Sequence, residues 1–199
     1  MWLIGLKDRP VGLITWNRIP ITSSKALHNN HTEGVICGVW KKNAQEDIIS
    51  NLASELRLKQ INLVIFPNWS QPEELIFLEI KSVINTIATH PDRSCITLLI
   101  DTTNISEEDA NLVISGVAMN LLMEENLDVD EGPEISIVGQ LSEIQLSALL
   151  TRAQARIILE NENQRAIAAT GINNVPTCNL SSLSNMRAVQ LTTGNWQFQ

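Results

Sequence analysis

Four apolar runs are spaced along residues 61–160, and they read INLVIF (61–66), ITLLID (96–101), EISIVG (134–139) and ARIILE (155–160). Short runs of this kind are typical of strands that are covered on both faces of a sheet. Helix-length amphipathic segments separate them, and this alternation indicates βαβ units. We therefore predict an α/β fold: a Rossmann-like parallel sheet of at least four strands with helices on both faces.

The segments between the runs predict helices with recognisable ends. A helix over 45–58 precedes the first strand. The next helix places Pro72 at its first position, where the missing N–H costs nothing. Ser106 and Ser142 open two further helices as capping boxes, each with a polar partner three residues later. A last helix, about 163–170, stops at Gly171, which suits a left-handed C-cap.

The composition divides the chain into three parts. Residues 1–43 hold three short strand-like pieces between polar turns, and we expect a small β-rich N-terminal appendage there. Residues 44–180 carry the Rossmann-like domain. Residues 181–199 are rich in Ser, Thr, Asn and Gly. We expect a short strand after Val175 and then a fraying C-terminal tail over 181–199.

The charge pattern excludes a nucleic-acid-binding surface. The formal net charge is −8, with +3 in residues 1–60 and −11 in residues 61–199. Proteins bind nucleic acids mainly through cationic side chains, which neutralise the phosphate groups. We therefore predict no nucleic acid partner. The apolar runs are far shorter than the ~20 residues of a membrane span, so we expect no membrane contact. The first apolar segment is interrupted by Lys7, Asp8 and Arg9, which is unfavourable for a signal peptide, and we expect a cytoplasmic location.

The sequence predicts no catalytic residue, no metal and no cofactor. A dinucleotide or S-adenosylmethionine site needs a glycine-rich turn after a strand, but the four turns here read FPNWSQ, DTTNIS, VGQLSE and LENENQ. The P-loop and GxSxG motifs are also missing. The three cysteines are widely spaced and form no CxxC pair, which is typical of free thiols.

If a ligand binds, we expect it at the carboxyl edge of the sheet, where the loops after parallel strands gather. Asp101 is a candidate ribose binder or metal ligand, although DTTN is also a strong turn in which Asp bonds its own backbone. Trp69 is a candidate stacking platform or a packing residue. The positional candidates for ligand binding are Asn68, Trp69, Asp101, Thr102, Gly139 and Glu160, with Asn104, Gln140 and Asn161 beside them.

The run ISIVGQLSEIQLSALLTRAQARIILENENQ (135–164) resembles the donor half of a GT-B glycosyltransferase. The stretches IFPNWSQPEE, HPDRSCITLLIDTTNISEEDANL, VAMNLLMEENLDVDEGPEISIVGQL and ARIILENEN are similar to an accessory domain of cyanobacterial proteins. In those proteins the domain accompanies tetratricopeptide-repeat glycosyltransferases and FkbM-type methyltransferases. The resemblance covers about 120 residues.

The resemblance implies a glycosyltransferase-like module without chemistry of its own. Retaining enzymes of that family hold the donor with two acidic residues eight positions apart, but eight positions after Glu160 stands Ala168. We therefore predict a non-catalytic accessory domain linked to enzymes of glycan or methyl transfer, with another protein chain or enzyme domain as partner. One alternative is the ligand-binding half of a nucleotide-sugar transferase that a partner chain completes. Another is an acidic protein-interaction module over residues 107–134.

Overall fold

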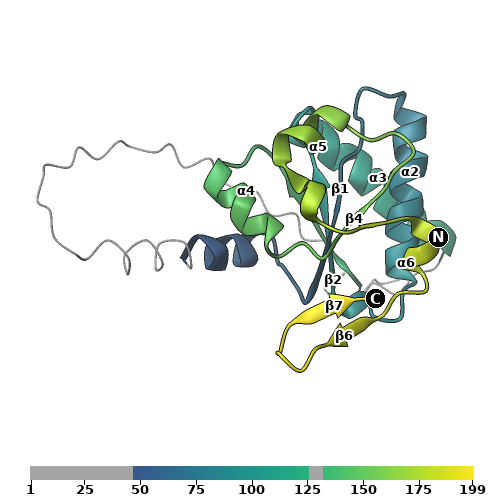
Figure 1. Cartoon of the computed structure of the whole chain (residues 1–199). Helices are drawn as coiled ribbons and strands as arrows, with labels where there is room; N and C mark the ends of the chain where they lie inside the picture. The colour runs from purple at the N-terminus through teal and green to yellow at the C-terminus, as the bar shows by residue number, and fades with distance from the viewer. Residues whose placement is uncertain (1–46, 126–131) are drawn as a thin grey trace, which may run out of the picture.

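The computed structural model describes residues 47–125 and 132–199 (Figure 1). The appendage expected for residues 1–43 and part of the acidic segment before the third strand lie outside this range. The described chain begins with a helix over residues 47–55. The further main elements are β1 (Ile61–Ile65), α2 (Glu73–Ala88), β2 (Ile96–Asp101), α3 (Glu107–Glu125), β3 (Glu134–Val138), α4 (Glu143–Leu150), β4 (Ala155–Ile157), α5 (Gln164–Thr170), β5 (Thr177–Cys178), α6 (Leu180–Leu183), β6 (Ala188–Gln190) and β7 (Trp196–Phe198).

The five strands β3-β2-β1-β4-β5 form one sheet in this order, and every neighbouring pair is parallel. This confirms the predicted α/β class and the sheet of at least four parallel strands. The chain builds one side of the sheet from β1 outward to β3, then crosses back and continues with β4 and β5. The strand order therefore reverses between β1 and β4, and ligands of open α/β sheets bind near such a point.

Three of the four predicted strands have nearly the predicted length. The run ITLLID matches β2, while β1 and β3 each end one residue earlier than predicted. The prediction for ARIILE was wrong at its end, because β4 stops at Ile157. Only two register pairs join β4 to β1, and β5 on its other side has two residues. Ile158 is consequently 44% exposed, although its side chain is apolar.

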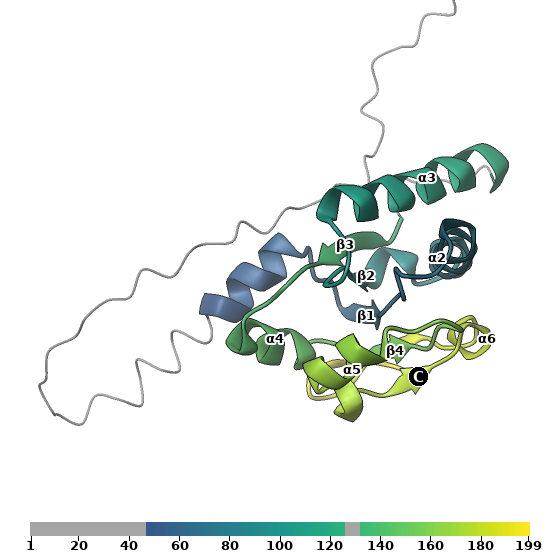
Figure 2. The same cartoon turned by 90° about the horizontal axis from the view of Figure 1, so that it is seen from above.

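Helices cover both faces of the sheet (Figure 2). The side chains of each strand point alternately to one face and to the other. On β1, Ile61, Leu63 and Ile65 face α2 and α3, and their side chains belong to the larger core cluster. Val64 and Phe66 face the helix 47–55, α4 and α5, which form a second and smaller core. The first face carries helices of 16 and 19 residues, whereas α4 and α5 on the second face have 8 and 7 residues.

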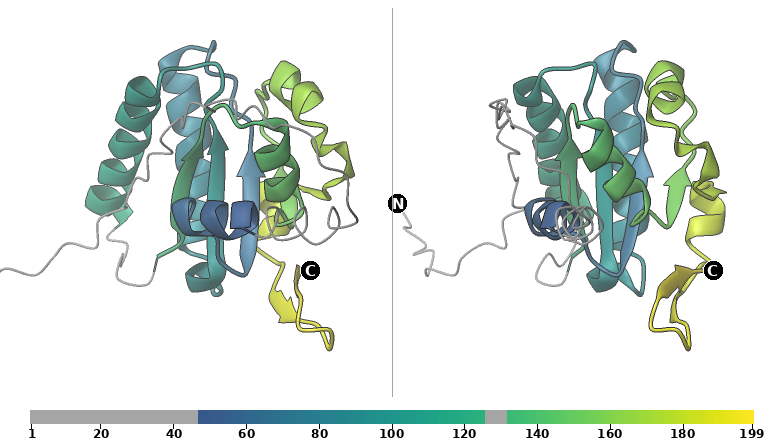
Figure 3. Two further views of the ribbon diagram at one scale, coloured as in Figure 1. Left: turned by 90° about the vertical axis from the view of Figure 1, so that its left-hand side faces the viewer. Right: turned by 60° about the vertical axis from the view of Figure 1, so that its left-hand side comes forward.

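The short helix 47–55 lies across the amino ends of the strands (Figure 3). The turn that follows this helix is bonded to the sheet. The Thr97 hydroxyl donates to the Arg57 carbonyl at 2.8 Å, and the Ser136 hydroxyl donates to the Leu56 carbonyl at 2.7 Å. These buried polar residues anchor the helix at one end of the second face and leave the carboxyl end of that face to other elements.

The helix ends agree with the predicted signals. Ser142 and Gln145 form the complete capping box of α4. The Asp109 N–H donates to the Ser106 hydroxyl, as predicted for α3. Pro72 is the N-cap of α2 rather than its first residue, one position away from the prediction. Gly171 ends α5 in the left-handed region with φ 65°, as expected for a glycine C-cap.

The prediction of a fraying tail over 181–199 was wrong. The short strand expected after Val175 is β5, but the chain then forms α6 and the antiparallel hairpin β6–β7. Phe198 near the C-terminus is 7% exposed and belongs to the larger core. Its ring meets the buried His90 ring with the centroids 5.4 Å apart. A long-range aromatic contact therefore orders a segment whose composition is typical of a loop.

In the described part of the chain, no helix is both long enough and apolar enough to cross a lipid bilayer.

Candidate functional site

A pocket of about 850 Å³ opens on the second face of the sheet, towards the carboxyl ends of the strands. Its floor is formed by Val64 of β1, Leu99 of β2 and Val138 of β3, and its walls come from α4 and α5. The pocket exists because the helices on this face are short and the helix 47–55 covers the opposite end of the strands (Figure 3). Its volume is in the range of small-molecule sites, about 300–1,000 Å³.

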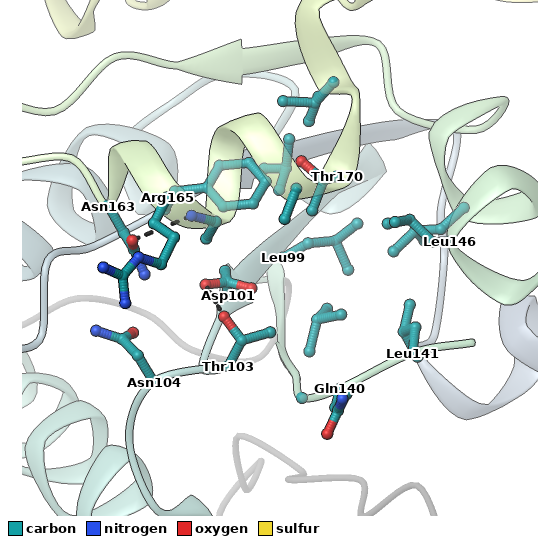
Figure 4. Close-up of a pocket in the computed structure, with 18 of the residues that line it drawn as sticks. Leu99, Asp101, Thr103, Asn104, Gln140, Leu141, Leu146, Asn163, Arg165 and Thr170 are labelled. Atoms are coloured by element: carbon teal, nitrogen blue, oxygen red, sulfur yellow. Dashed lines mark hydrogen bonds between the residues drawn. The ribbon is translucent and has the colours of Figure 1, made fainter. Parts of the chain in front are cut away.

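The pocket has a polar end and an apolar end (Figure 4). The polar end gathers side chains from the end of β2, from the loop after it and from the start of α5, namely Asp101, Thr103, Asn104, Asn163 and Arg165. The apolar end is lined mainly by α4 and its flanks, with Leu141, Leu146, Leu149, Leu150 and Ala153. A pocket of this kind suits a molecule with one polar and one apolar part.

Asp101 is the buried acid of the polar end. It is the last residue of β2 and only 4% exposed. The Thr103 hydroxyl donates to Asp101 Oδ2 at 3.0 Å, so the predicted turn is present. Burial raises the pKa of the Asp101 carboxyl to about 6, and the hydrogen bonds from Thr103 oppose this increase. Near neutral pH, Asp101 is therefore mainly a carboxylate that accepts hydrogen bonds, and a small fraction is protonated.

The loops after β1 and β4 are joined beside the pocket, at the point where the strand order reverses. Pro67 and Glu162 form an antiparallel bridge between the two loops. The Asn68 N–H donates to the Asn161 carbonyl at 3.0 Å, and the Asn163 N–H donates to the Phe66 carbonyl at 2.8 Å. An ion pair between Glu162 and the Arg156 guanidinium ties the loop after β4 to that strand. These bonds fix Asn68 and Asn163 at the pocket wall.

The structure brings together three of the six predicted ligand-binding residues, since Asn68, Asp101 and Gly139 line the pocket. Asn104 and Gln140, named beside them, line it too. Trp69, Thr102, Glu160 and Asn161 are not among the lining residues. Asp101, Gly139 and Gln140 come from the ends of neighbouring strands, so the reasoning from strand ends succeeds on this side of the sheet.

Trp69 and Thr102 are turned into the protein instead. The Trp69 side chain is 8% exposed, belongs to the larger core, and its indole N–H donates to the Asp101 carbonyl at 2.8 Å. It packs against the sheet, as one of the two interpretations of this residue expected. Thr102 is 6% exposed, and its N–H donates to the Val138 carbonyl at 2.9 Å. Trp69 thus supports the main chain of the residue that forms the polar end.

Sequence reasoning missed the contribution of α4 and α5. Arg165, Ala166, Ala169 and Thr170 of α5 line the pocket. The pattern of small residues in QRAIAAT was a signal that could have found them, because alanines on a helix leave room beside the sheet. Two apolar residues of α4, Ala148 and Leu149, pack in the smaller core, but Leu146 and Leu150 are only half-buried.

Arg165 is the one cationic side chain among the described lining residues, and Asp101 and Glu143 are the acidic ones. Within residues 47–125 and 132–199, no group of three or more histidine, cysteine or acidic side chains could hold a metal ion.

The described histidine and cysteines lie away from the pocket. His90 is 2% exposed and lies under the C-terminal hairpin, where its Nε2 is 3.0 Å from the Met186 carbonyl. Cys178 is buried in β5, and burial raises the pKa of its thiol. Cys95 and Cys178 are both free. These residues have structural surroundings and no contact with the pocket lining.

Comparison with known proteins gives weak structural similarity alone. No protein-family model and no curated protein matches the chain. A solved structure of an alpha,alpha-trehalose-phosphate synthase (UDP-forming) from Burkholderia xenovorans, in complex with glucose-6-phosphate, is similar with a TM-score of 0.39 and 13% identity. The match covers 59% of this chain and 27% of that chain, so this protein corresponds to about a quarter of the synthase chain. At this level of similarity, the match carries no conclusion about activity or ligand.

Proposed function

We propose that this chain is a small-molecule-binding α/β domain that catalyses no transfer by itself, and that it acts as a glycosyltransferase-like accessory module beside a partner enzyme. The observation that carries the binding function is the pocket of about 850 Å³ at the carboxyl edge of the sheet. It combines an extended apolar wall with a few convergent polar groups, which is the usual composition of a ligand site. The accessory role rests on the sequence resemblance described above.

The placement of the reactive side chains supports a role without covalent chemistry. Nucleophilic catalysis needs a nucleophile within hydrogen-bond reach of a base. The pocket lining includes the hydroxyl groups of Ser70, Thr103 and Thr170, and no described histidine, cysteine or lysine accompanies them. The Thr103 hydroxyl is bonded to a carboxylate, Asp101, and this bond holds the turn after β2. His90 is bonded to the main chain of the C-terminal hairpin.

A thermal-shift screen of small uncharged fragments with the full-length chain tests the binding function. A fragment present at ten times its Kd stabilises the folded state by about 1.4 kcal/mol, which corresponds to a rise in Tm of roughly 3–6 °C. Ala169 lines the pocket from α5 and is itself exposed, so Ala169→Trp would fill the pocket without disturbing the core. This substitution should abolish the shift.

Ala168→Trp is the matched control for that variant. Ala168 is exposed on the same helix but does not line the pocket, so the control should keep the fragment-induced shift. Binding that persists in Ala169→Trp would place the ligand elsewhere, and a screen without any hit would contradict the proposed function.

A second candidate function is an enzyme that uses Asp101 as its general acid or base. The pKa of about 6 at Asp101 favours it, because a general acid or base works best when its pKa lies near the working pH. Turnover by the purified chain, lost in Asp101→Asn, would support this second function over the first.

A further inference from the structure

The charges around the pocket mouth are unfavourable for a phosphorylated ligand. The helix α4 starts beside the pocket, and helix N-termini commonly hold phosphate. Its first turn is acidic instead, and Glu143 of that turn lines the pocket. The start of α5 also lines the pocket, and its first turn carries no acidic residue. Asp101 adds a buried acid inside the pocket. Arg165 alone opposes this negative charge among the described lining residues.

The polar end instead offers both acceptors and donors over a short span. A carboxylate has about four acceptor sites, and Thr103 uses at most two of those on Asp101 through its hydroxyl and its backbone N–H. Asn104 extends from the loop after β2, and Arg165 extends from the first turn of α5, at the same end of the pocket (Figure 4). An amide and a guanidinium supply donors, and the amide can also accept.

Hydroxyl groups match this arrangement better than an amine or a phosphate does. A hydroxyl can donate to Asp101 and accept from Asn104 or Arg165 at the same time. An ammonium group could only donate, so it would leave the donors of Asn104 and Arg165 without an acceptor. A phosphate could only accept, and it would face the Asp101 carboxylate.

We propose that the pocket binds a neutral molecule that carries adjacent hydroxyl groups on one side and an apolar ring or chain on the other. The hydroxyl groups bond to Asp101, Asn104 and Arg165, and the apolar part lies against Leu141, Leu146 and Leu149. This inference deepens the proposed binding function and rests on it. It assigns the ligand to the class of glycosides and similar polyols with an apolar substituent, and not to phosphorylated cofactors.

Calorimetric titration of the full-length chain with matched aryl probes tests this assignment. The probes are the 4-nitrophenyl glucoside, galactoside and mannoside, and 4-nitrophenyl phosphate, which share the same apolar ring. We expect at least one glycoside to bind ten times or more tightly than the phosphate. Asp101→Asn should weaken glycoside binding about tenfold, because a hydrogen bond to a charged acceptor is lost. The same samples report turnover through released nitrophenolate, and we expect none.

Glu160→Gln is the control for the loss of a carboxylate at this edge of the sheet. Glu160 is exposed and does not line the pocket, so its substitution should leave glycoside binding unchanged. Equal or tighter binding of 4-nitrophenyl phosphate, blocked by Ala169→Trp, would overturn the ligand assignment and leave the proposed function intact. Failure of all three glycosides while neutral fragments bind would overturn the assignment as well. Failure of every probe and fragment would contradict both.

Discussion

Asp101 has two roles at the end of β2, one in the fold and one in the pocket. It holds the turn into α3 through Thr103, and it presents a buried carboxylate to the cavity. Such burial is costly for the ionised form, because the protein interior solvates charge poorly. A carboxylate that only capped a turn could lie in water at no such cost. Its burial at the pocket floor is therefore the residue-level observation that favours a ligand.

The cost of this burial predicts a specific pH dependence of stability. The Asp101 carboxyl has its pKa raised from 3.8 to about 6 in the folded state, which corresponds to roughly 3 kcal/mol. Between pH 4 and pH 6 the folded state therefore binds more protons than the unfolded state, and stability from this group falls as the pH rises. Asp101→Asn removes the ionisation, so its free energy of unfolding relative to wild type should increase by up to roughly 3 kcal/mol from pH 4 to pH 7.

Urea denaturation of both proteins across this pH range measures the difference. Thr103→Val is an informative companion, because it removes a hydrogen bond that lowers the pKa of Asp101. In that variant the folded-state pKa of Asp101 should be higher, so the decline in stability should extend to a higher pH. A constant difference between Asp101→Asn and wild type at all pH values would show that Asp101 is ionised alike in both states.

At the scale of elements, the sequence predicted those features whose signals are local. Each strand run, cap and helix stripe lies within one segment, and the buried residues of α2 repeat with the helical period as predicted, namely Ile76, Ile80, Val83, Ile84 and Ile87. The short β4 and the ordered C-terminal hairpin depend on distant partners, and no local pattern shows them. The pocket walls were missed for the same reason, since α4 and α5 meet the sheet only in the folded protein.

Two glycines occupy helix positions at which an alanine should change stability in opposite directions. Gly171 has φ 65° and open space around it, so Gly171→Ala should cost about 1 kcal/mol through its backbone alone. Gly116 lies within α3, where an added Cβ would meet Phe77 at an ordinary 3.6 Å. Gly116→Ala should therefore stabilise the protein by up to about 1 kcal/mol. Thermal denaturation of both variants shows whether stability falls for Gly171→Ala and rises for Gly116→Ala. The opposite change in either variant would contradict the position assigned to that glycine in its helix.

His90 is predicted to hold the C-terminal hairpin in place. The Asp92 N–H donates to His90 Nδ1 at 3.0 Å, so the neutral ring carries its proton on Nε2 and donates to the Met186 carbonyl. His90→Ala would leave both main-chain groups without their partner and would remove the ring contact with Phe198. We expect a local loss of roughly 2 kcal/mol, or about 30-fold faster amide exchange over 186–199.

Hydrogen-exchange mass spectrometry measures this effect segment by segment. Peptides from β1 and β2 serve as the internal control, because their hydrogen bonds lie within the sheet. Exchange that rises equally in the hairpin and in these strands would mean that the hairpin folds only with the whole domain. Unchanged exchange in the hairpin would show that His90 does not hold it.

At the scale of the whole molecule, the two faces of the sheet differ in how completely the helices cover them. The long helices α2 and α3 close the first face, and the larger core lies beneath them. The three short helices on the second face leave the carboxyl half of the strands open as the pocket. Asp101 and Glu143 add two acidic groups to the lining of this pocket. Architecture and charge thus both point to a neutral ligand on this face.

Amide chemical-shift mapping of the full-length chain, titrated with the tightest-binding 4-nitrophenyl glycoside, tests this account most directly. We predict shifts confined to the segments 101–104, 139–141 and 163–170, because each of them contains residues that line the pocket. The amides of α2 and of the hairpin should keep their positions. Shifts centred on the outer surface of α2 and α3, or no shifts at saturating probe, would contradict the central claim that this pocket is a ligand site.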